Sequence, residues 1–250
     1  MLLGLLVLAI LVGGALQRVT GMGFGLVAGP FVVLMIGPVQ GVLLVNVVGA
    51  IMALILVGRL LRSVDWYRYA ILAAASVATS VPAALLLRGV SSSALDVMVG
   101  LIIVGAMTLA LVAGRLRASG EGFGRAPLPL VITGVASGFG SVAAGVGGPP
   151  VAVYTVLDRW DPRTFAATAQ PFFMTNALAA ATAKMTVGRA TLPTLAWWQW
   201  VIIAVAVLAS LGLGELLAPR ISREATRRVL IVLAYAGGTA TLVRGVVGLV

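Results

Sequence analysis

The 250-residue sequence contains no cysteine and no histidine, and only 10% of its residues are charged. Without cysteine there is no disulfide and no thiol nucleophile. Without histidine the commonest general base and the commonest transition-metal ligand are missing as well. Asp and Glu together number only seven. Because nucleophiles, bases and ligands are so scarce, we expect neither an enzyme nor a bound metal or other cofactor.

Hydrophobic residues are abundant instead, at 61% of the chain. A soluble domain averages roughly 25% charged residues, so the composition predicts an all-α polytopic membrane protein. The net charge of +10 comes from arginines between apolar runs, which is typical of cytoplasmic anchoring rather than of nucleic-acid binding. With a window of about 20 residues, the predicted segments are 1–20, 23–37, 39–58, 66–87, 92–114, 127–138, 141–157, 163–187, 195–217 and 225–249.

Two glycine-rich stretches interrupt the apolar pattern. The first is "GMGFGLVAGP" (residues 21–30) and the second is "GFGSVAAGVGGPP" (residues 138–150). Inside a bilayer a broken helix survives only where protein or a watery cavity surrounds its unpaired backbone groups. We expect Pro30 and Pro149–Pro150 to lie in the first turn of a helix that restarts after each break, where no N–H group is needed.

Matching residues in the two halves predict an internal duplication. Asn46 is followed by Gly58–Arg59, and the same spacing separates Asn176 from Gly188–Arg189. Three further pairs occur in the same order, although each match alone is weak. They are Trp66 with Trp198, Ser91 with Ser222, and Gly29–Pro30 with Gly148–Pro149.

The positions of the basic residues predict that the two halves are inverted. If each glycine-rich segment is a hairpin, three crossings remain in each half, and basic residues divide twelve to five between the two sides. Four crossings per half would divide them nine to seven, which is hardly a bias. The predicted repeats are 1–114 and 127–250, joined by a cytoplasmic linker at 115–126, with both termini outside. The five outer basic residues are Arg18, Arg88, Lys184, Arg189 and Arg244.

Two breaks at matching positions of inverted halves are predicted to meet near the midplane, where secondary transporters bind substrate. Glycines admit a ligand close to the backbone, and restarted helices direct N–H groups and a positive dipole end toward it, which favours an anion. The alternatives are tight helix packing for the glycines, interhelical hydrogen bonds for the asparagines and an interfacial anchor for Arg18. The candidate substrate-binding residues are Gln17, Arg18, Thr20, Gly21, Gly23, Gly25, Asn46, Ser137, Gly138, Gly140, Gly147, Gly148, Thr168, Gln170 and Asn176.

Three stretches of this chain resemble a known family. "GMGFGLVAGPF", "GVASGFGSVAAGVGGPPVAVY" and "FAATAQPFFMTN" are similar to the TauE/SafE sulfite exporter family, also called the toluene sulfonate uptake permease family. The resemblance implies transport of sulfite, sulfoacetate or another small organosulfur anion across the bacterial inner membrane.

From the residues and the resemblance together we predict a secondary transporter that exports such an anion by alternating access. A passive anion channel built on the same site and a structural subunit of a larger membrane complex stay open as alternatives. No residue pattern decides between a monomer and a homodimer.

Overall fold

The computed structural model describes residues 2–21, 24–58, 61–115, 122–220 and 222–249, and within these ranges it contains helices and no strands. The predicted all-α fold class is therefore confirmed. The helices are α1 (Leu2–Thr20), α2 (Phe24–Ile36), α3 (Pro38–Val57), the 3₁₀ turn η1 (Leu61–Ser63), α4 (Trp66–Leu87), α5 (Ser92–Arg115), α6 (Pro127–Ala144), α7 (Gly148–Leu157), α8 (Pro162–Thr186), α9 (Trp197–Leu217) and α10 (Arg223–Val247).

Local sequence explains where most of these helices begin. Asp65 caps α4 by accepting a hydrogen bond from the backbone N–H of Arg68, and Ser222 caps α10 in the same way. Asp161 caps α8, and hydrogen bonds from the backbone N–H and hydroxyl of Thr164 lower the pKa of its carboxyl. Proline stands at the first helical positions of α3, α6, α7 and α8, where its missing N–H costs nothing.

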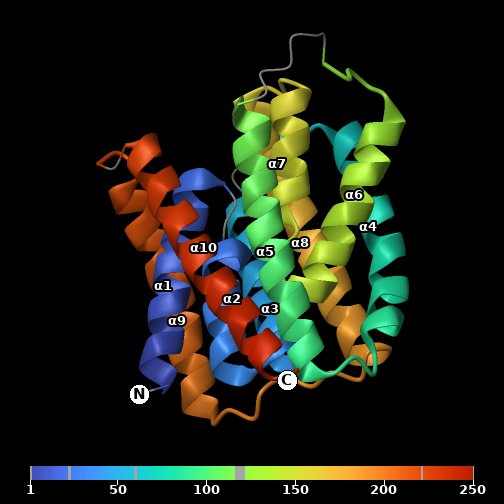
Figure 1. Cartoon of the computed structure of the whole chain (residues 1–250). Coiled ribbons are helices and arrows are strands. Elements are labelled where there is room, and N and C mark those ends of the chain that lie inside the picture. The colour runs from blue at the N-terminus through green and yellow to red at the C-terminus, as the bar shows by residue number, and fades with distance from the viewer. Residues whose placement is uncertain (1, 22–23, 59–60, 116–121, 221, 250) are drawn as a thin grey trace.

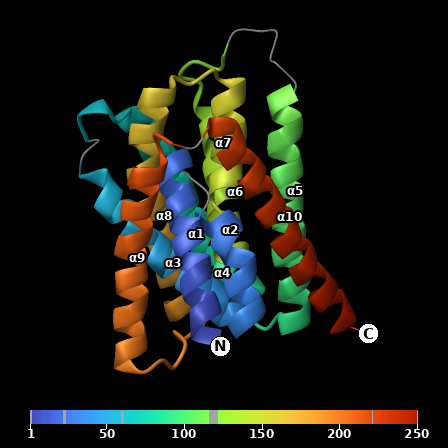
Figure 2. The same ribbon diagram turned by 90° about the vertical axis from the view of Figure 1, so that its left-hand side faces the viewer.

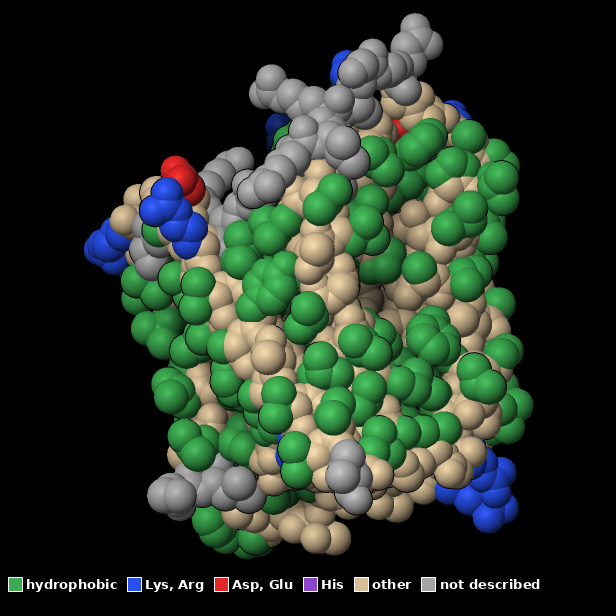
Figure 3. All heavy atoms as spheres, viewed as in Figure 1, with side chains coloured by type: hydrophobic (Ala, Val, Ile, Leu, Met, Phe, Trp, Pro, Cys, Tyr) green, Lys and Arg blue, Asp and Glu red, His purple; other side chains and the backbone are tan. Residues whose placement is uncertain are grey.

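In the part of the chain that the structure describes, seven helices are long and apolar enough to cross a membrane, namely α1, α3, α4, α5, α6, α9 and α10. Figure 3 shows hydrophobic side chains covering the flank of the molecule, while Lys and Arg side chains gather at its two ends. The sequence predicted six membrane crossings. It assigned the residues of α1 and α6 to the two hairpins and did not count them as crossings. Both helices have 18 residues or more, so each meets the length requirement by itself. α8 is absent from the seven because its Thr, Gln and Asn residues lower its hydropathy.

The path of the chain sets the two halves in opposite directions. The N- and C-termini lie at the same end of the molecule, here called the terminal end (Figures 1 and 2). α1 rises from the terminal end and α2 returns toward it, whereas α6 descends from the opposite end and α7 returns to that end. The opposite end, where α5 finishes and α6 begins, is here called the linker end. These directions are the ones that inverted halves require, and the internal duplication itself stays a prediction.

The two hairpins pack across the halves. α1 lies along α9, and α6 lies along α4, while α5 packs on α10 and α3 on α8. Each hairpin therefore has its longer arm against a crossing helix of the other half.

An arginine–aspartate pair holds the outer end of each short hairpin arm. At the linker end, the guanidinium of Arg68 lies 2.6 Å from the carboxylate of Asp158, which ends α7 and is buried. At the terminal end, Nε of Arg244 donates to Asp96 at 2.8 Å, and Nη1 of Arg244 donates to the carbonyl of Leu34 near the end of α2 at 2.7 Å. The C-terminal end of each short helix is thus fixed, that of α7 at the linker end and that of α2 at the terminal end.

The second break lies later in the chain than the sequence predicted. α6 continues to Ala144, so the interruption falls at residues 145–147 and not near residue 139. Gly138 lies within α6. A Cβ there would lie 2.6 Å from the carbonyl oxygen of Ser76, so the glycine lets α4 approach closely. The predicted arms, residues 127–138 and 141–157, were therefore wrong at the end of the first arm and at the start of the second.

Two further expectations were wrong. Pro30 lies in the middle of α2 and not in its first turn, because α2 already begins at Phe24. Gly29–Pro30 is consequently no positional match for Gly148–Pro149, which does open α7.

Arg18 was predicted at the outer face with the termini. It lies in the last turn of α1 and pairs with Glu215 in the last turns of α9, near the linker end. The reason is the length of α1, whose 19 residues carry its end across most of the bundle. With Arg18 counted at the linker end, the excess of basic residues at that end over the terminal end is larger than the sequence predicted. The predicted orientation depends on this excess.

Candidate functional site

A small cavity of about 60 Å³ lies where the tips of the two hairpins meet. Its walls come from both halves of the chain, so neither half can form it alone. The lining residues are Gln17, Phe24, Gly25, Leu26, Val45, Asn46, Gly49, Ser141, Gly145, Val146, Gly147, Gly148, Phe173, Asn176 and Ala177.

Glycines allow the two tips to touch. A Cβ on Gly25 of α2 would lie 2.1 Å from the carbonyl oxygen of Gly145, so only a glycine permits this approach. Gly145 itself ends α6 with φ at 70°, a left-handed conformation that disfavours any side chain. A Cβ on Gly147 would meet the amide nitrogen of Asn176 at 2.1 Å. The breaks are therefore sites of close backbone contact around the cavity.

Asn46 and Asn176 are joined through Ser141. Nδ2 of Asn46 donates to the carbonyl oxygen of Ser141 at 2.9 Å, and Nδ2 of Asn176 donates to its hydroxyl at 2.7 Å. Oδ1 of Asn176 accepts a hydrogen bond from Ser76 at 2.9 Å, and Nδ2 of Asn46 also donates to Val42. Both amides are buried and held in fixed orientations at the cavity wall.

Two helix N-termini face this cavity. α2 begins at Phe24 and α7 begins at Gly148, and both residues line the cavity. The first N–H groups of a helix have no intrahelical acceptor and lie at the positive end of its dipole. In α7 the next two residues are prolines, which have no N–H, so Gly147 and Gly148 supply the nearest backbone donors.

The cavity lining contains no Asp, Glu, Lys or Arg among the described residues. Amide groups and helix N-termini therefore determine its electrostatics, and no carboxylate opposes a negative ligand. This arrangement can bind a small anion through neutral donors.

A second and larger space, here called the vestibule, adjoins the cavity and has a volume of about 640 Å³. It lies toward the linker end, because its walls come from the last turns of α1 and α5 and the first turns of α8 and α10. Gln17 and Leu26 line both spaces. The lining residues are Gln17, Arg18, Val19, Thr20, Gly21, Leu26, Leu56, Ala106, Met107, Leu111, Pro149, Ala152, Pro162, Phe165, Ala166, Gln170, Thr226, Leu230 and Ile231.

Gln17 and Gln170 stand out among the polar residues of the vestibule. Gln17 is buried and lines both the cavity and the vestibule. Nε2 of Gln170 donates to the carbonyl of Gly21 at the first hairpin tip at 3.0 Å. The Oε1 atom of Gln170 is buried without a hydrogen-bond partner in the described part of the chain.

The structure divides the fifteen predicted site residues into four groups. Gln17, Gly25, Asn46, Gly147, Gly148 and Asn176 line the cavity. Arg18, Thr20, Gly21 and Gln170 line only the vestibule. Four residues line neither of these spaces, namely Ser137, Gly138, Gly140 and Thr168. The last, Gly23, lies outside the described residues.

Of the four residues that line neither space, Gly138, Gly140 and Thr168 serve the packing of α6 and α8. The hydroxyl of Thr168 accepts a hydrogen bond from the backbone N–H of Asp65 and donates to Thr164, which ties α8 to the start of α4. A Cβ on Gly140 would lie 2.4 Å from the carbonyl of Val146, so this glycine allows the second tip to fold back. Ser137 is fully buried, and its hydroxyl has no partner within the described ranges.

Sequence reasoning omitted several cavity residues. Ser141 lies inside the second glycine-rich stretch, and its position between two asparagines could not be predicted from spacing alone. Gly145 lies inside that stretch, yet the break was placed before it. The apolar members of the lining, such as Phe24 and Phe173, have no signal that separates them from ordinary core residues.

A comparison with known families gives one match. The family model described as sulfite exporter TauE/SafE matches residues 6–241, which include both hairpin tips and every residue of the cavity. Neither a curated protein nor a solved structure matches the chain.

Proposed function

The chain belongs to the sulfite exporter TauE/SafE family, and we propose that it is a secondary transporter that exports sulfite or a related small sulfur-containing anion. The bilayer is the bacterial inner membrane, with the linker end cytoplasmic and both termini outside. The basic residues of the linker end support this orientation by the positive-inside rule.

One observation supports the proposal above all others, namely the cavity between the two hairpin tips. It combines fixed amide donors with two helix N-termini, and it has no carboxylate among its described lining residues. Donors of this kind suit the three oxygens of a sulfite or sulfonate group. Gln17 and Asn176, with the backbone N–H groups of Gly147 and Gly148, are the groups that we assign to the anion. Both hydrogens of Nδ2 of Asn46 are already donated, to Val42 and Ser141, so we assign Asn46 to the positioning of Ser141.

The membrane potential supplies the driving force for export. A potential of about 100 mV, negative inside, is worth about 2.3 kcal/mol for each elementary charge. A monoanion is therefore driven outward roughly fiftyfold without a coupling ion. The cavity needs no proton-carrying group for this task, and none of its described lining residues is Asp, Glu or Lys.

The packing of the two halves supports transport by alternating access. The vestibule connects the cavity with the linker end. On the terminal side, the apolar cluster of Val33, Val42, Val99, Ile103 and Val146 is buried. We infer that one half rocks on the other, with α1 moving on α9 and α6 moving on α4. This motion closes the path to the linker end and opens a path to the terminal end.

The proposal predicts electrogenic flux of sulfite in proteoliposomes made from the purified protein alone. A potassium–valinomycin gradient sets the potential, and sulfite efflux should rise several-fold when the lumen is negative. Unlabelled sulfite on the opposite side should accelerate exchange of labelled sulfite, as a carrier requires. Flux no greater than that of empty liposomes would refute the proposal, and flux without accelerated exchange would indicate a channel.

A further inference from the structure

We propose that Lys184 of α8 gives the central cavity a preference for a doubly charged anion over a singly charged anion of the same shape. The ammonium group of Lys184 contacts the end of α6 and lines neither the cavity nor the vestibule. Lys184 is therefore a positioning residue, which acts on the anion through the second hairpin tip at residues 145–147. This inference rests on the proposed function for the place where the anion binds.

Lys184 is a buried cation in the last turn of α8. Helical side chains lean toward the N-terminus of their helix, and α8 runs toward the terminal end (Figure 1), so the side chain of Lys184 leans into the bundle. Its Nζ atom donates a hydrogen bond to the backbone carbonyl of Val142 in α6 at 2.9 Å. The ammonium group therefore lies against α6 and not in the solvent at the terminal end.

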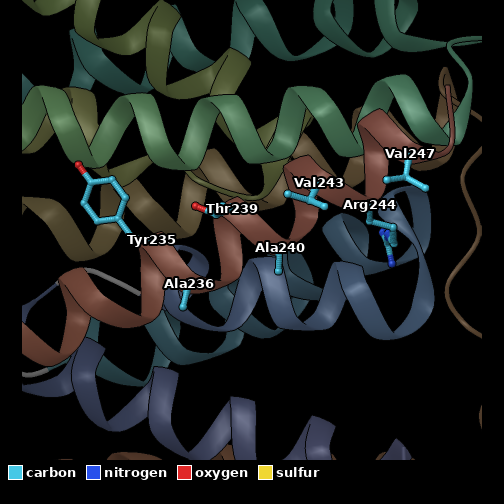
Figure 4. A pocket seen from close by; sticks show the side chains of 7 residues that line it. All are labelled: Tyr235, Ala236, Thr239, Ala240, Val243, Arg244 and Val247. Atoms are coloured by element: carbon cyan, nitrogen blue, oxygen red, sulfur yellow. The ribbon is translucent and has the colours of Figure 1, made fainter. Parts of the chain in front are cut away.

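No Asp or Glu in the described ranges forms an ion pair with Lys184. The buried acids have partners of their own, since Asp158 pairs with Arg68 and Asp96 pairs with Arg244. Arg244 lies on an open groove of about 810 Å³ along α10 (Figure 4), where Asp96 balances its charge. A buried charge without an opposite charge is costly, and within a membrane it usually marks the path of an ion. An anion in the cavity supplies the negative charge that Lys184 lacks.

The carbonyl that Lys184 contacts belongs to the last turn of α6. In a continuous helix the carbonyl of Val142 would accept from the N–H group of Val146, but that group donates to Gly140. The free carbonyls at the end of a helix carry about −0.5 elementary charge. Ser141 and Gly145 line the cavity, so the end of α6 would repel an anion there if no cation were bound to it.

The ammonium group of Lys184 reverses the sign of the charge at the second tip. One elementary positive charge exceeds the roughly −0.5 at the end of α6, and the start of α7 adds roughly +0.5. The first tip has no comparable excess, because Arg18 pairs with Glu215 and the carbonyl of Gly21 accepts from the neutral amide of Gln170. The second tip is therefore the source of the positive potential in the cavity.

A positive charge behind the cavity wall acts twice as strongly on a dianion as on a monoanion. For a separation of about 10 Å and an effective dielectric constant of about 20, it tightens binding of a monoanion roughly 15-fold and of a dianion roughly 250-fold. The preference for the dianion that arises from Lys184 is therefore roughly 15-fold. A role in packing alone would change both affinities by the same factor.

The experiment compares the affinities for sulfite and chlorate, measured by calorimetry on the purified protein at neutral pH. The two ions have the same pyramidal shape, and sulfite in its doubly charged form has one more negative charge. Affinities for sulfite are expressed for the doubly charged form. In Lys184→Met we expect the preference for sulfite over chlorate to fall roughly 15-fold.

Two further variants at this position separate charge from folding. Lys184→Gln is a second neutral variant that keeps a hydrogen-bond donor, and it should lose the same preference. Lys184→Arg keeps the charge and should keep the preference within about threefold of the original protein. Replacement of a buried charge by an apolar residue of similar volume is often neutral for stability, so the thermal unfolding midpoint of Lys184→Met should not fall.

Arg88→Met is the matched control, because it removes a basic side chain near the same end of the molecule. Arg88 follows α4 directly and is exposed, so water and salt screen its charge from the cavity. The affinities for sulfite and chlorate should both stay at the values of the original protein.

The outcomes distinguish this inference from the proposed function. An unchanged preference in Lys184→Met and Lys184→Gln, or an equal loss of affinity for sulfite and chlorate, would overturn the role of Lys184 even if sulfite efflux from proteoliposomes is normal. If sulfite does not cross the membrane but the preference falls in both neutral variants and not in Arg88→Met, the role of Lys184 stands and the proposed function fails.

Discussion

Asn176→Asp is expected to abolish sulfite transport almost completely while the protein keeps its fold. The carboxylate has the shape of the amide and can still accept the hydrogen bond from the hydroxyl of Ser76. The hydroxyl of Ser141 now accepts a hydrogen bond from Nδ2 of Asn176, and it can rotate to donate to the carboxylate instead. The carboxylate places a negative charge at the wall of a cavity that we assign to an anion. Two like charges about 4 Å apart repel by about 4 kcal/mol at an effective dielectric constant of about 20, which corresponds to roughly a thousandfold loss of affinity.

The measurement is sulfite efflux from proteoliposomes, with the elution profile and the thermal unfolding midpoint as checks on folding. Gln199→Glu is the matched control, because it also exchanges an amide for a carboxylate but lies at the start of α9, far from the cavity lining. It should transport at the original rate. Asn176→Ala, which removes a donor without adding charge, should lose about tenfold, as expected for one hydrogen bond of about 1.4 kcal/mol. Transport by Asn176→Asp within threefold of the original protein would contradict the assignment.

Gly25→Ala should separate the two hairpin tips and reduce transport about 10- to 100-fold. Its Cβ would lie 2.1 Å from the carbonyl oxygen of Gly145, and a backbone atom cannot move aside as a flexible side chain can. Overpacking of this kind costs about 1–3 kcal/mol. Because the cavity exists only where the tips meet, the same displacement should enlarge it and move the donors away from the anion. We therefore expect weaker sulfite binding together with a lower unfolding midpoint.

Gly29→Ala on the same helix is the control for this prediction. There the nearest atom to a new Cβ is the carbonyl oxygen of Ala144 at 3.7 Å, an ordinary contact. Alanine is also the better helix former by about 0.5–1 kcal/mol, so the variant should be as stable as the original protein or more so. Equal transport by Gly25→Ala and Gly29→Ala would show that contact between the tips is not needed for function.

The sequence predicted the long helices well because their ends have local signals. α4 was predicted at 66–87 and spans Trp66–Leu87, since Asp65 is a strong N-cap before an apolar run. The breaks were predicted from glycine content, and the first lies where it was expected, between α1 and α2. The pairing of Asn46 with Asn176 was also informative, since both line one cavity.

The remaining features depend on tertiary contacts that composition does not reveal. Gly138 and Gly145 look equivalent in the sequence, but Gly138 packs on the backbone of α4 within a helix, whereas Gly145 ends that helix with a positive φ. Pro30 is tolerated in the middle of α2 even though proline usually breaks a helix. The role of Ser141 as the bridge between the asparagines requires the folded α6.

The central claim is that a small oxyanion binds where the two hairpin tips meet. Selenite is the selenium counterpart of sulfite, and its anomalous scattering locates it directly in crystals of the protein. We predict one strong anomalous peak within hydrogen-bonding distance of the backbone N–H groups of Gly147 and Gly148 and of the side chain of Gln17 or Asn176. Crystals that bind selenite elsewhere on the protein, with no anomalous density between the tips, would contradict the account.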